Sequence, residues 1–235
     1  MEQMGVARVA LDPHNPLIPP HRLVHLDLKG APPRIAYLKR LLPIFKQLGA
    51  TGLLLEWEDM FPFSGSLAKV AASNHYTPAE ELGLEVVPLV QTFGHLEFVL
   101  KLEPFAGLRE VPDIPQAVCP SLNDSLLLVA KMIDQVVSMH ANVAALRYVH
   151  IGCDEVFTMG ECPRCRSQPR DDLFLNHVSR VARLVRQRHR ATPLIWDDML
   201  RHVPAAAMQE YSLGELVEPM VWVYAENVYR FVLPA

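Results

Sequence analysis

The sequence predicts an α/β fold in which parallel strands alternate with helices and form an incomplete eight-stranded barrel. Short apolar runs alternate with helical stretches along most of the chain, a pattern typical of a parallel sheet covered by helices. Polar residues gather on one strand face near the C-terminal ends, as at the mouth of a TIM (β/α)8 barrel, whereas an open sheet buries both faces. The sequence contains neither GxGxxG nor GxxxxGK followed by serine or threonine, the nucleotide-binding signatures that would favour an open sheet.

The composition is that of one large globular domain. Of the 235 residues, 50% are hydrophobic and 20% are charged, and the formal net charge is -4. A chain of this length buries a substantial core, and its charge balance argues against a polycation that binds nucleic acid through phosphates. No apolar run approaches the roughly 18 residues of a membrane-spanning helix. We therefore expect neither nucleic acid nor a membrane as a partner.

Residues 1–21 are expected to form a flexible leader ahead of a partial barrel domain over residues 22–235. Prolines cluster in this leader at Pro13, Pro16, Pro19 and Pro20. The first ten residues lack the apolar stretch of a secretory signal, and four cysteines are too few for a disulfide scaffold. Reduced thiols and a cytoplasmic or nuclear location are therefore expected.

The first βαβ unit has the clearest pattern. Residues 23–28 (LVHLDL) predict a strand, and residues 34–48 have the apolar spacing of a helix that stops at Gly49. Pro43 inside that helix is expected to kink it. Residues 52–57 (GLLLEW) predict the second strand.

The second helix is expected to be shortened. Residues 84–91 predict the third strand, and Thr77 and Pro78 before them resemble a helix cap and first turn. The strand pattern resumes almost at once, although a parallel crossover normally needs a dozen or more residues.

In the rest of the chain, predicted helices and strands alternate regularly. The sequence predicts helices at 121–140 and 172–189 and strands at 146–152, 193–196 and 220–224. Too few residues follow Tyr224 for two further βα units, so strands seven and eight of a full barrel are expected to be missing. The strand edges that such a barrel exposes favour self-association.

Side-chain alternation places polar residues of two predicted strands on one face. His25 and Asp27 share a face in the first strand, with Lys29 just past its end. His150 and Asp154 share a face in the fourth strand. These polar groups are expected at the barrel mouth, while the alternate apolar residues face the helices.

The segment RYVHIGCDEVF (147–157) carries the most chemical information. It runs from a buried-strand pattern into two adjacent carboxylates, Asp154 and Glu155, at the catalytic position of a barrel. Adjacent carboxylates in a partly desolvated site do not both ionise easily, so we expect one raised and one low pKa. Glycosidic cleavage uses one such acid and one such anion. The alternatives are that the pair caps the next helix and that His150 is a core residue rather than a catalytic one.

Five motifs in order resemble family 20 of the glycoside hydrolases, the β-N-acetylhexosaminidases. HIGCDE is similar to the H-x-G-x-D-E signature of that family, and RLVHLDLKGAPP, EDMFPF, PLVQTFGHLEFVLK and LIWDDML look closer still to its nucleocytoplasmic branch. The resemblance covers Arg22 to about Tyr224. It implies a retaining, substrate-assisted hydrolase on a TIM barrel that removes terminal non-reducing GalNAc or GlcNAc from glycoconjugates. It implies no metal or organic cofactor.

The resemblance also implies roles for four residues. Glu155 would protonate the leaving oxygen and later activate water, while Asp154 would orient the acetamido group and stabilise its oxazolinium form. His95, in QTFGH, would tune the glutamate, with Glu58 of EWED behind it. The alternative for Glu58 is an exposed loop acid.

Three aromatic residues, Trp196, Trp222 and Tyr224, resemble the walls that hold the N-acetyl methyl group and the sugar face. Core packing is their alternative. Asp27 and Lys29 are candidates to bind sugar hydroxyls, and a structural ion pair at the rim is the alternative for them.

The CPRC motif, Cys162 to Cys165, resembles half a zinc site or a redox motif. A structural zinc ion needs two more ligands, but Cys153 has the opposite parity from the pocket and Cys119 is distant in the sequence. We therefore expect no metal. The arginine-rich stretch at 164–190 is interrupted by acids and is interpreted as a solvated helix face.

Two hypotheses from different classes compete. The first is an active exo-β-N-acetylhexosaminidase with Asp154 and Glu155 as the catalytic pair. The second is a catalytically inactive, truncated remnant that acts as a binding or regulatory partner of other chains, which the abrupt end of the predicted barrel favours.

Overall fold

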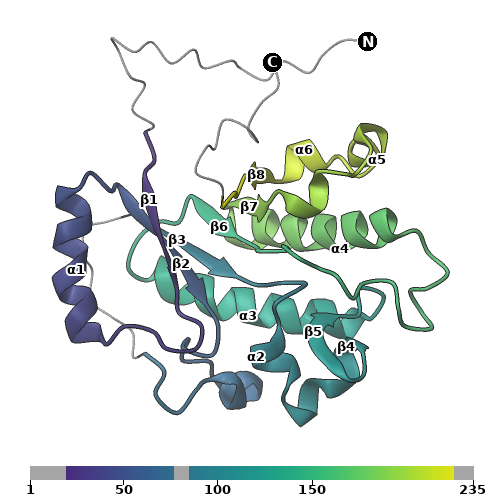
Figure 1. Cartoon of the computed structure of the whole chain (residues 1–235), viewed down its shortest axis with the longest axis horizontal. Helices are drawn as coiled ribbons and strands as arrows, with labels where there is room; N and C mark the ends of the chain where they lie inside the picture. The colour runs from purple at the N-terminus through teal and green to yellow at the C-terminus, as the bar shows by residue number, and fades with distance from the viewer. Residues whose placement is uncertain (1–19, 77–84, 225–235) are drawn as a thin grey trace, which may run out of the picture.

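Six parallel strands form one sheet in the computed structural model of the chain, which describes residues 20–76 and 85–224. The sheet is curved (Figure 1). The strand order is β1-β2-β3-β6-β7-β8, and each strand is parallel to its neighbours. The strands are β1 (Leu23–Asp27), β2 (Gly52–Trp57), β3 (Glu85–Val90), β6 (Tyr148–His150), β7 (Thr192–Trp196) and β8 (Glu218–Met220). A sheet that grows in chain order has the connectivity of a barrel.

Three longer helices and several short ones connect the strands. The longer helices are α1 (Ile35–Gln47), α3 (Asn123–Ala141) and α4 (Arg170–Leu184), and α4 continues into the π-helix η3 (Val185–His189). The short ones are η1 (Gly65–Val70), α2 (Glu97–Leu100), η2 (Glu103–Leu108), η4 (Asp198–Leu200), α5 (Ala205–Glu210) and α6 (Leu213–Leu216). No described helix is long and apolar enough to cross a membrane.

The main core lies between the sheet and the helices that cover its outer face. Ile151 and Ile195 from the sheet side join Ile133 of α3 and Val178 of α4, and all four are fully buried. A smaller apolar cluster consists of Leu54, Val87, Leu89 and Leu194. These residues alternate with the outward-facing ones, so they form part of the inner layer of a barrel.

Most predicted elements are confirmed. The strand predicted at 52–57 is β2, and β1 and β3 match their predictions to within one residue at each end. The helix predicted at 34–48 is α1, which continues through Pro43 as one helix. The six-stranded sheet confirms the prediction of an incomplete barrel.

Two predicted strands need correction. The strand predicted at 146–152 is only Tyr148–His150, because Gly152 adopts a left-handed φ of 66° that a strand does not accommodate. The strand predicted at 220–224 is Glu218–Met220. Its pairing with β7 ends at Trp196, where the chain turns into η4, so residues 221–224 lie beyond the sheet.

The crossover from β2 to β3 contains the 3-10 helix η1 and no α-helix within described residues 58–76. The helix cap predicted at Thr77 and Pro78 lies outside the described residues, as do residues 1–19 of the predicted leader.

An antiparallel hairpin of β4 (Arg109–Val111) and β5 (Ile114–Val118) follows β3 and α2, and the sequence patterns did not predict it. In Figure 1 the hairpin lies beside α2, at the end of the sheet where α3 begins. Its strands are short, and the repeating strand signal is correspondingly weak.

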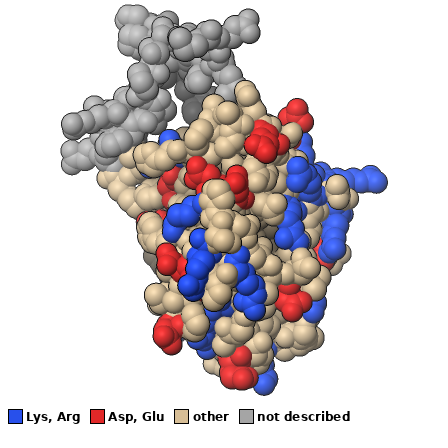
Figure 2. Space-filling view, turned by 90° about the vertical axis from the view of Figure 1, so that its right-hand side faces the viewer, with Lys and Arg blue, Asp and Glu red and all other residues tan. Residues whose placement is uncertain are grey.

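Charged side chains of both signs are scattered over one side of the molecule (Figure 2). Figure 2 shows Lys and Arg interspersed with Asp and Glu on this side, which lies to the right in Figure 1. Within the arginine-rich stretch, Arg188 donates to Asp134 at 2.9 Å and Arg180 donates to Asn123 at 3.1 Å. The part of the stretch in α4 and η3 is therefore a solvated and partly paired helix surface, as predicted, whereas Arg164 and Arg166 lie in the turn before α4.

Candidate active site

A sharp turn after β6 carries Asp154 and Glu155. The φ angles of Gly152, Cys153 and Glu155 are 66°, 70° and 50°. Left-handed backbone is unfavourable for residues with a Cβ atom and persists where surrounding contacts hold it, often at functional sites. At Gly152 a Cβ atom would lie 2.1 Å from Oε1 of Gln91, so only glycine fits there.

Gln91, directly after β3, fixes the carboxylate of Asp154. Its Nε2 atom donates to Oε1 of Glu56 and to Oδ1 of Asp154, both at 3.0 Å. Its Oε1 atom accepts the backbone N–H of Cys153 at 3.3 Å. Only 1% of Gln91 is exposed, so this amide holds the turn from beneath.

His95 lies between the two carboxylates. Its Nε2 atom is 3.5 Å from Oδ2 of Asp154 and 3.3 Å from Oε2 of Glu155. A φ of 52° at His95 adds another left-handed residue to the site. All three side chains are partly exposed, so a substrate can reach them. One imidazole nitrogen therefore lies beside both carboxyl groups.

Burial raises the pKa of Asp154, while the Gln91 hydrogen bond and the charge of His95 oppose the rise. The raised pKa that the sequence predicts for one member of the pair therefore belongs to Asp154. The resemblance implies that Glu155, and not Asp154, is the neutral acid. The raised pKa of Asp154 therefore does not identify the acid, and the two roles have to be assigned from the contacts of each carboxyl group. A poorly solvated carboxylate is strongly stabilised when positive charge develops beside it, which suits Asp154 as the stabilising anion.

Asp198, in η4 after β7, connects Glu155 to Trp222. Its Oδ2 atom accepts the backbone N–H of Glu155 at 2.9 Å, and its Oδ1 atom accepts the indole N–H of Trp222 at 3.1 Å. Asp197 accepts the backbone N–H of Trp222 at 3.2 Å and pairs with Arg201 at 2.7 Å. Trp222 is thus anchored next to the carboxylate turn, although it lies beyond the sheet.

Trp196 ends β7 on the inner face and covers His150. The two ring centroids are 4.3 Å apart, and the ring of His25 lies 5.8 Å from Trp196. His150 is fully buried, its Nδ1 atom accepts the N–H of Gly152 at 3.0 Å, and burial lowers its pKa to about 3. His150 is therefore a neutral core residue, as its alternative interpretation holds.

Glu58 pairs with Lys29 and has no hydrogen bond to His95 among the described residues. Lys29 Nζ is 3.2 Å from Glu58 Oε1 and 3.8 Å from Glu97 Oε2. Glu58 is 3% exposed, so the exposed-acid alternative is wrong, while its role behind His95 stays a prediction. Asp27 accepts the backbone N–H of Lys29 at 2.8 Å. Lys29 therefore forms an ion pair with Glu58 and not with Asp27 among the described residues, and the binding of sugar hydroxyls by Asp27 and Lys29 stays a prediction.

Tyr224 lies in solvent. It is 96% exposed, and its ring centroid is 5.3 Å from that of Trp222. Core packing is excluded for Tyr224, while its role as an aromatic wall stays a prediction.

Sequence reasoning missed three residues that hold the site, namely Glu56, Gln91 and Asp198. Glu56 lies two residues after Leu54, and Gln91 lies two residues after Leu89, so all four side chains are on the inner face of the sheet. This alternation could have predicted that Glu56 and Gln91 point toward the site. Asp198 belongs to the LIWDDML motif and directly follows a strand end, where functional groups gather in barrels.

Two groups of described residues bring metal-ligating atoms within 4.8 Å of one another. They are His95, Asp154 and Glu155, and Glu110, Cys119, Cys162 and Cys165. The first group is the site described above. In the second, Cys119 Sγ is 3.6 Å from the sulfur atoms of both Cys162 and Cys165. The premise that Cys119 is too distant to complete the CPRC motif is therefore wrong, because the β4–β5 hairpin brings it there.

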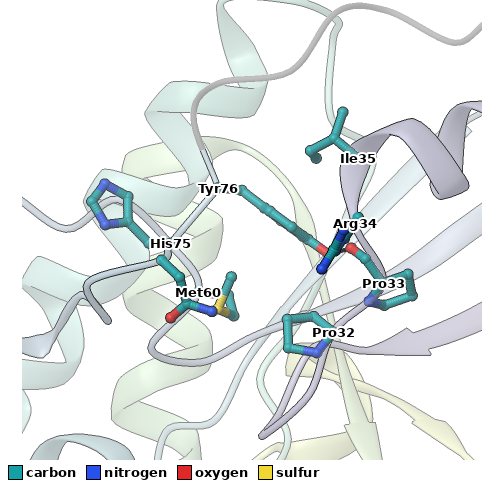
Figure 3. Close-up of a pocket in the computed structure, with 8 residues that line it drawn as sticks. Pro32, Pro33, Arg34, Ile35, Met60, His75 and Tyr76 are labelled. Carbon is teal, nitrogen blue, oxygen red and sulfur yellow. Dashed lines mark hydrogen bonds between the residues drawn. The ribbon is translucent and has the colours of Figure 1, made fainter.

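A cavity of about 380 Å³ lies away from the carboxylates, near the start of α1 (Figure 3). In Figure 3 the ring of Tyr76 points toward Arg34 and Pro33, and its hydroxyl donates to the carbonyl of Pro33. The lining residues include no carboxylate and none of the residues at the Asp154–Glu155 turn. The cavity therefore lacks an acid–base pair for glycosidic chemistry.

Comparison with known proteins agrees with this arrangement. The sequence model for the catalytic domain of glycosyl hydrolase family 20 matches residues 72–228, more than half of the chain. Hexosaminidase D of Bos taurus is 45% identical over 223 residues, which cover 88% of this chain and 64% of that protein. Hexosaminidase D of Homo sapiens is 46% identical over 223 residues, which cover 88% of this chain and 45% of that protein. The chain spans less than two thirds of the length of these relatives.

Solved structures share the fold. Dispersin B gives a TM-score of 0.64 at 14% identity, over 88% of this chain and 66% of that one. A β-N-acetylhexosaminidase from Bacteroides fragilis gives a TM-score of 0.61 at 18% identity, over 83% of this chain and 49% of that one. The incomplete α/β barrel is confirmed by these likenesses.

Proposed function

We propose, on the premise that this chain belongs to glycosyl hydrolase family 20, that it carries the catalytic pair of an exo-β-N-acetylhexosaminidase. Its substrates are terminal GalNAc or GlcNAc residues at the non-reducing ends of cytoplasmic or nuclear glycoconjugates. The observation that supports the proposal most directly is the position of His95 Nε2, 3.5 Å from Asp154 and 3.3 Å from Glu155.

Asp154 acts as the stabilising anion in this proposal. The 2-acetamido oxygen of the substrate attacks the anomeric carbon, and positive charge develops on the resulting oxazolinium ring. The hydrogen bond from Gln91 holds Asp154 Oδ1 in one orientation, so the carboxylate needs little reorganisation as that charge appears. Partial burial keeps water from screening the attraction.

Glu155 acts as the general acid and then as the general base. It protonates the leaving oxygen, and the resulting carboxylate later takes a proton from the water that opens the oxazolinium ring. His95 Nε2 lies 3.3 Å from Oε2 of this carboxyl group, close enough to tune it in the course of the reaction. The anchors from Asp198 to the backbone N–H of Glu155 and to Trp222 place an aromatic surface beside the reacting bond.

The test of substrate assistance is a series of aryl N-acyl-β-glucosaminides in which the acetyl group carries increasing numbers of fluorine atoms. Fluorine withdraws electrons from the acetamido oxygen, so kcat/KM should fall steeply along the series. Asp154→Asn should lower kcat for every member without unfolding the chain. A kcat/KM that does not depend on fluorination, or an active Asp154→Asn variant, would contradict the proposed mechanism.

A further inference from the structure

A buried cluster of three cysteines and one glutamate lies between the β4–β5 hairpin and the loop that follows the carboxylate turn. The cluster consists of Glu110 from β4, Cys119 after β5, and Cys162 and Cys165 of the CPRC motif. All four are buried, and their candidate ligand atoms lie within 4.8 Å of one another. We propose that these four side chains bind a structural zinc ion.

The sulfur geometry fits a tetrahedral metal site. Cys119 Sγ lies 3.6 Å from the sulfur of Cys162 and 3.6 Å from that of Cys165. Two thiolates bound to tetrahedral zinc at about 2.3 Å lie about 3.8 Å apart. The two equal distances leave Cys119 shared between both partners, as it would be around a central ion, and a disulfide would select one of them.

Glu110 supplies the fourth ligand. Its Oε1 atom accepts the backbone N–H groups of Gly160, Glu161 and Cys162 at 3.1, 2.9 and 2.9 Å. Its Oε2 atom is buried without an N–H or O–H donor, and among the described residues the only groups that approach this carboxyl group from the other side are the three cysteine thiols, which are weak donors. A buried carboxylate oxygen without a strong donor is costly, and a cation at the centre of the cluster would satisfy it.

The local backbone is shaped to present these ligands. The β4–β5 pairing changes register between Arg109 and Val111, and such an irregularity redirects the intervening side chain, Glu110. The N–H groups of Cys165 and Arg166 both donate to the carbonyl of Cys162 at 3.0 Å, which closes the CPRC turn. Ser121 Oγ lies 3.1 Å from Cys165 Sγ, where its hydroxyl can donate to a thiolate and orient it.

The site would be structural rather than catalytic, because four protein ligands leave no open coordination position. It would join the hairpin to the loop that leaves the active site. The same hairpin carries Gln116, whose side chain donates to the backbone carbonyl of Glu155 at 2.8 Å and accepts from Thr158 at 3.2 Å. Zinc binding would therefore restrain the backbone of the carboxylate turn, and this consequence can be measured separately from metal content.

The first test is the metal content of the purified chain by inductively coupled plasma mass spectrometry. We expect one zinc ion per chain, and loss of most of it in Cys162→Ser and Glu110→Gln. The glutamine keeps an oxygen for the three N–H groups but loses the anionic ligand. Cys153→Ser removes a buried cysteine outside the cluster and should retain the zinc. A folded wild-type chain without zinc, or Cys162→Ser with full zinc, would overturn the proposal.

A second measurement does not depend on the folding of any variant. The wild-type chain, stripped of metal and loaded with Co²⁺, should show the visible bands of a tetrahedral site and a near-ultraviolet thiolate charge-transfer band. Removal of the metal should also lower the melting temperature. Absence of the thiolate band, or a disulfide among the three cysteines in non-reducing mass spectrometry, would overturn the zinc assignment even if the chain is an active hydrolase.

Discussion

Asp198 Oδ2 accepts the backbone N–H of Glu155 at 2.9 Å, so the residue that follows β7 by two positions fixes the backbone of the residue proposed as the acid. The other oxygen of Asp198 accepts the indole N–H of Trp222 at 3.1 Å. One carboxylate therefore sets the distance between the acid and an aromatic surface. Catalysis depends on such positioning, because small displacements of reacting groups cost large factors in rate.

Asp198→Asn should lower kcat by about 10- to 100-fold with little change in melting temperature. The asparagine side chain replaces one of the two oxygen atoms with an NH2 group, so a donor would face either the backbone N–H of Glu155 or the indole N–H of Trp222. Steady-state kinetics with an aryl N-acetyl-β-hexosaminide measure the effect. Asp113→Asn, in the exposed β4–β5 turn, is the matched control. Wild-type kcat in Asp198→Asn would show that this bridge does not position the acid.

Gly152→Ala should destabilise the chain by about 2 to 4 kcal/mol. Its φ of 66° is unfavourable for alanine, and the new Cβ atom would lie 2.1 Å from the Gln91 side chain. Chemical denaturation measures the loss. Gly107→Ala is the control, since a Cβ atom there meets nothing within 4 Å. Equal stabilities of the two variants would contradict the tight packing of Gln91 against the turn.

Gln91→Leu should move the acidic limb of the pH–activity profile to higher pH. The Gln91 hydrogen bond favours the ionised form of Asp154, and burial already raises the pKa of that carboxyl. Loss of the bond should raise the pKa further. Because Asp154 has to be an anion in the proposed mechanism, activity should disappear at a higher pH as the solution is acidified. If the acidic limb of Gln91→Leu lay at the same pH as in the wild type, or at a lower pH, the ionisation of Asp154 would not control that limb.

Glu58→Gln should remove a pH dependence of stability. Burial raises the pKa of Glu58 from 4.5 to about 7, although Lys29 opposes the rise. A carboxyl with a raised folded-state pKa contributes stability that is fully present below its unfolded pKa and is lost as pH rises through the folded value. From about pH 5 to about pH 8, the wild type should therefore lose roughly 2 to 3 kcal/mol relative to Glu58→Gln. If the free energy of unfolding changed with pH in the same way in both proteins, the pKa of Glu58 would not be raised in the folded chain.

The regular alternation of strands and helices was predictable because buried residues recur with a different period in a strand than in a helix. The run GLLLEW corresponds residue for residue to β2, and parity placed Asp154 on the polar side. The end of β8 was not predictable in this way. The apolar run MVWVY continues past Met220, but the partner strand β7 stops at Trp196, and a strand ends where its partner ends.

Most of the site features that could not be predicted from the sequence depend on contacts between residues far apart in the chain. Glu58 and Lys29 are 29 positions apart, and only the pairing of β1 with β2 brings them together. Cys119 reaches Cys162 through the β4–β5 hairpin, whose strands of 3 and 5 residues leave a weak periodic signal. Local spacing therefore identified CPRC as half of a metal site but not its other half.

The proposed role of Glu155 is tested by release of the aryl group from aryl N-acetyl-β-galactosaminide and N-acetyl-β-glucosaminide by this chain, beside Glu155→Gln. Glu103→Gln, at an exposed glutamate in η2, is the control. Cooperative thermal melting establishes that each sample is folded. We expect activity in the wild type and control, and a loss of about 10²- to 10⁴-fold in Glu155→Gln. A folded wild-type chain without activity, or an active Glu155→Gln variant, would contradict the proposed role of Glu155.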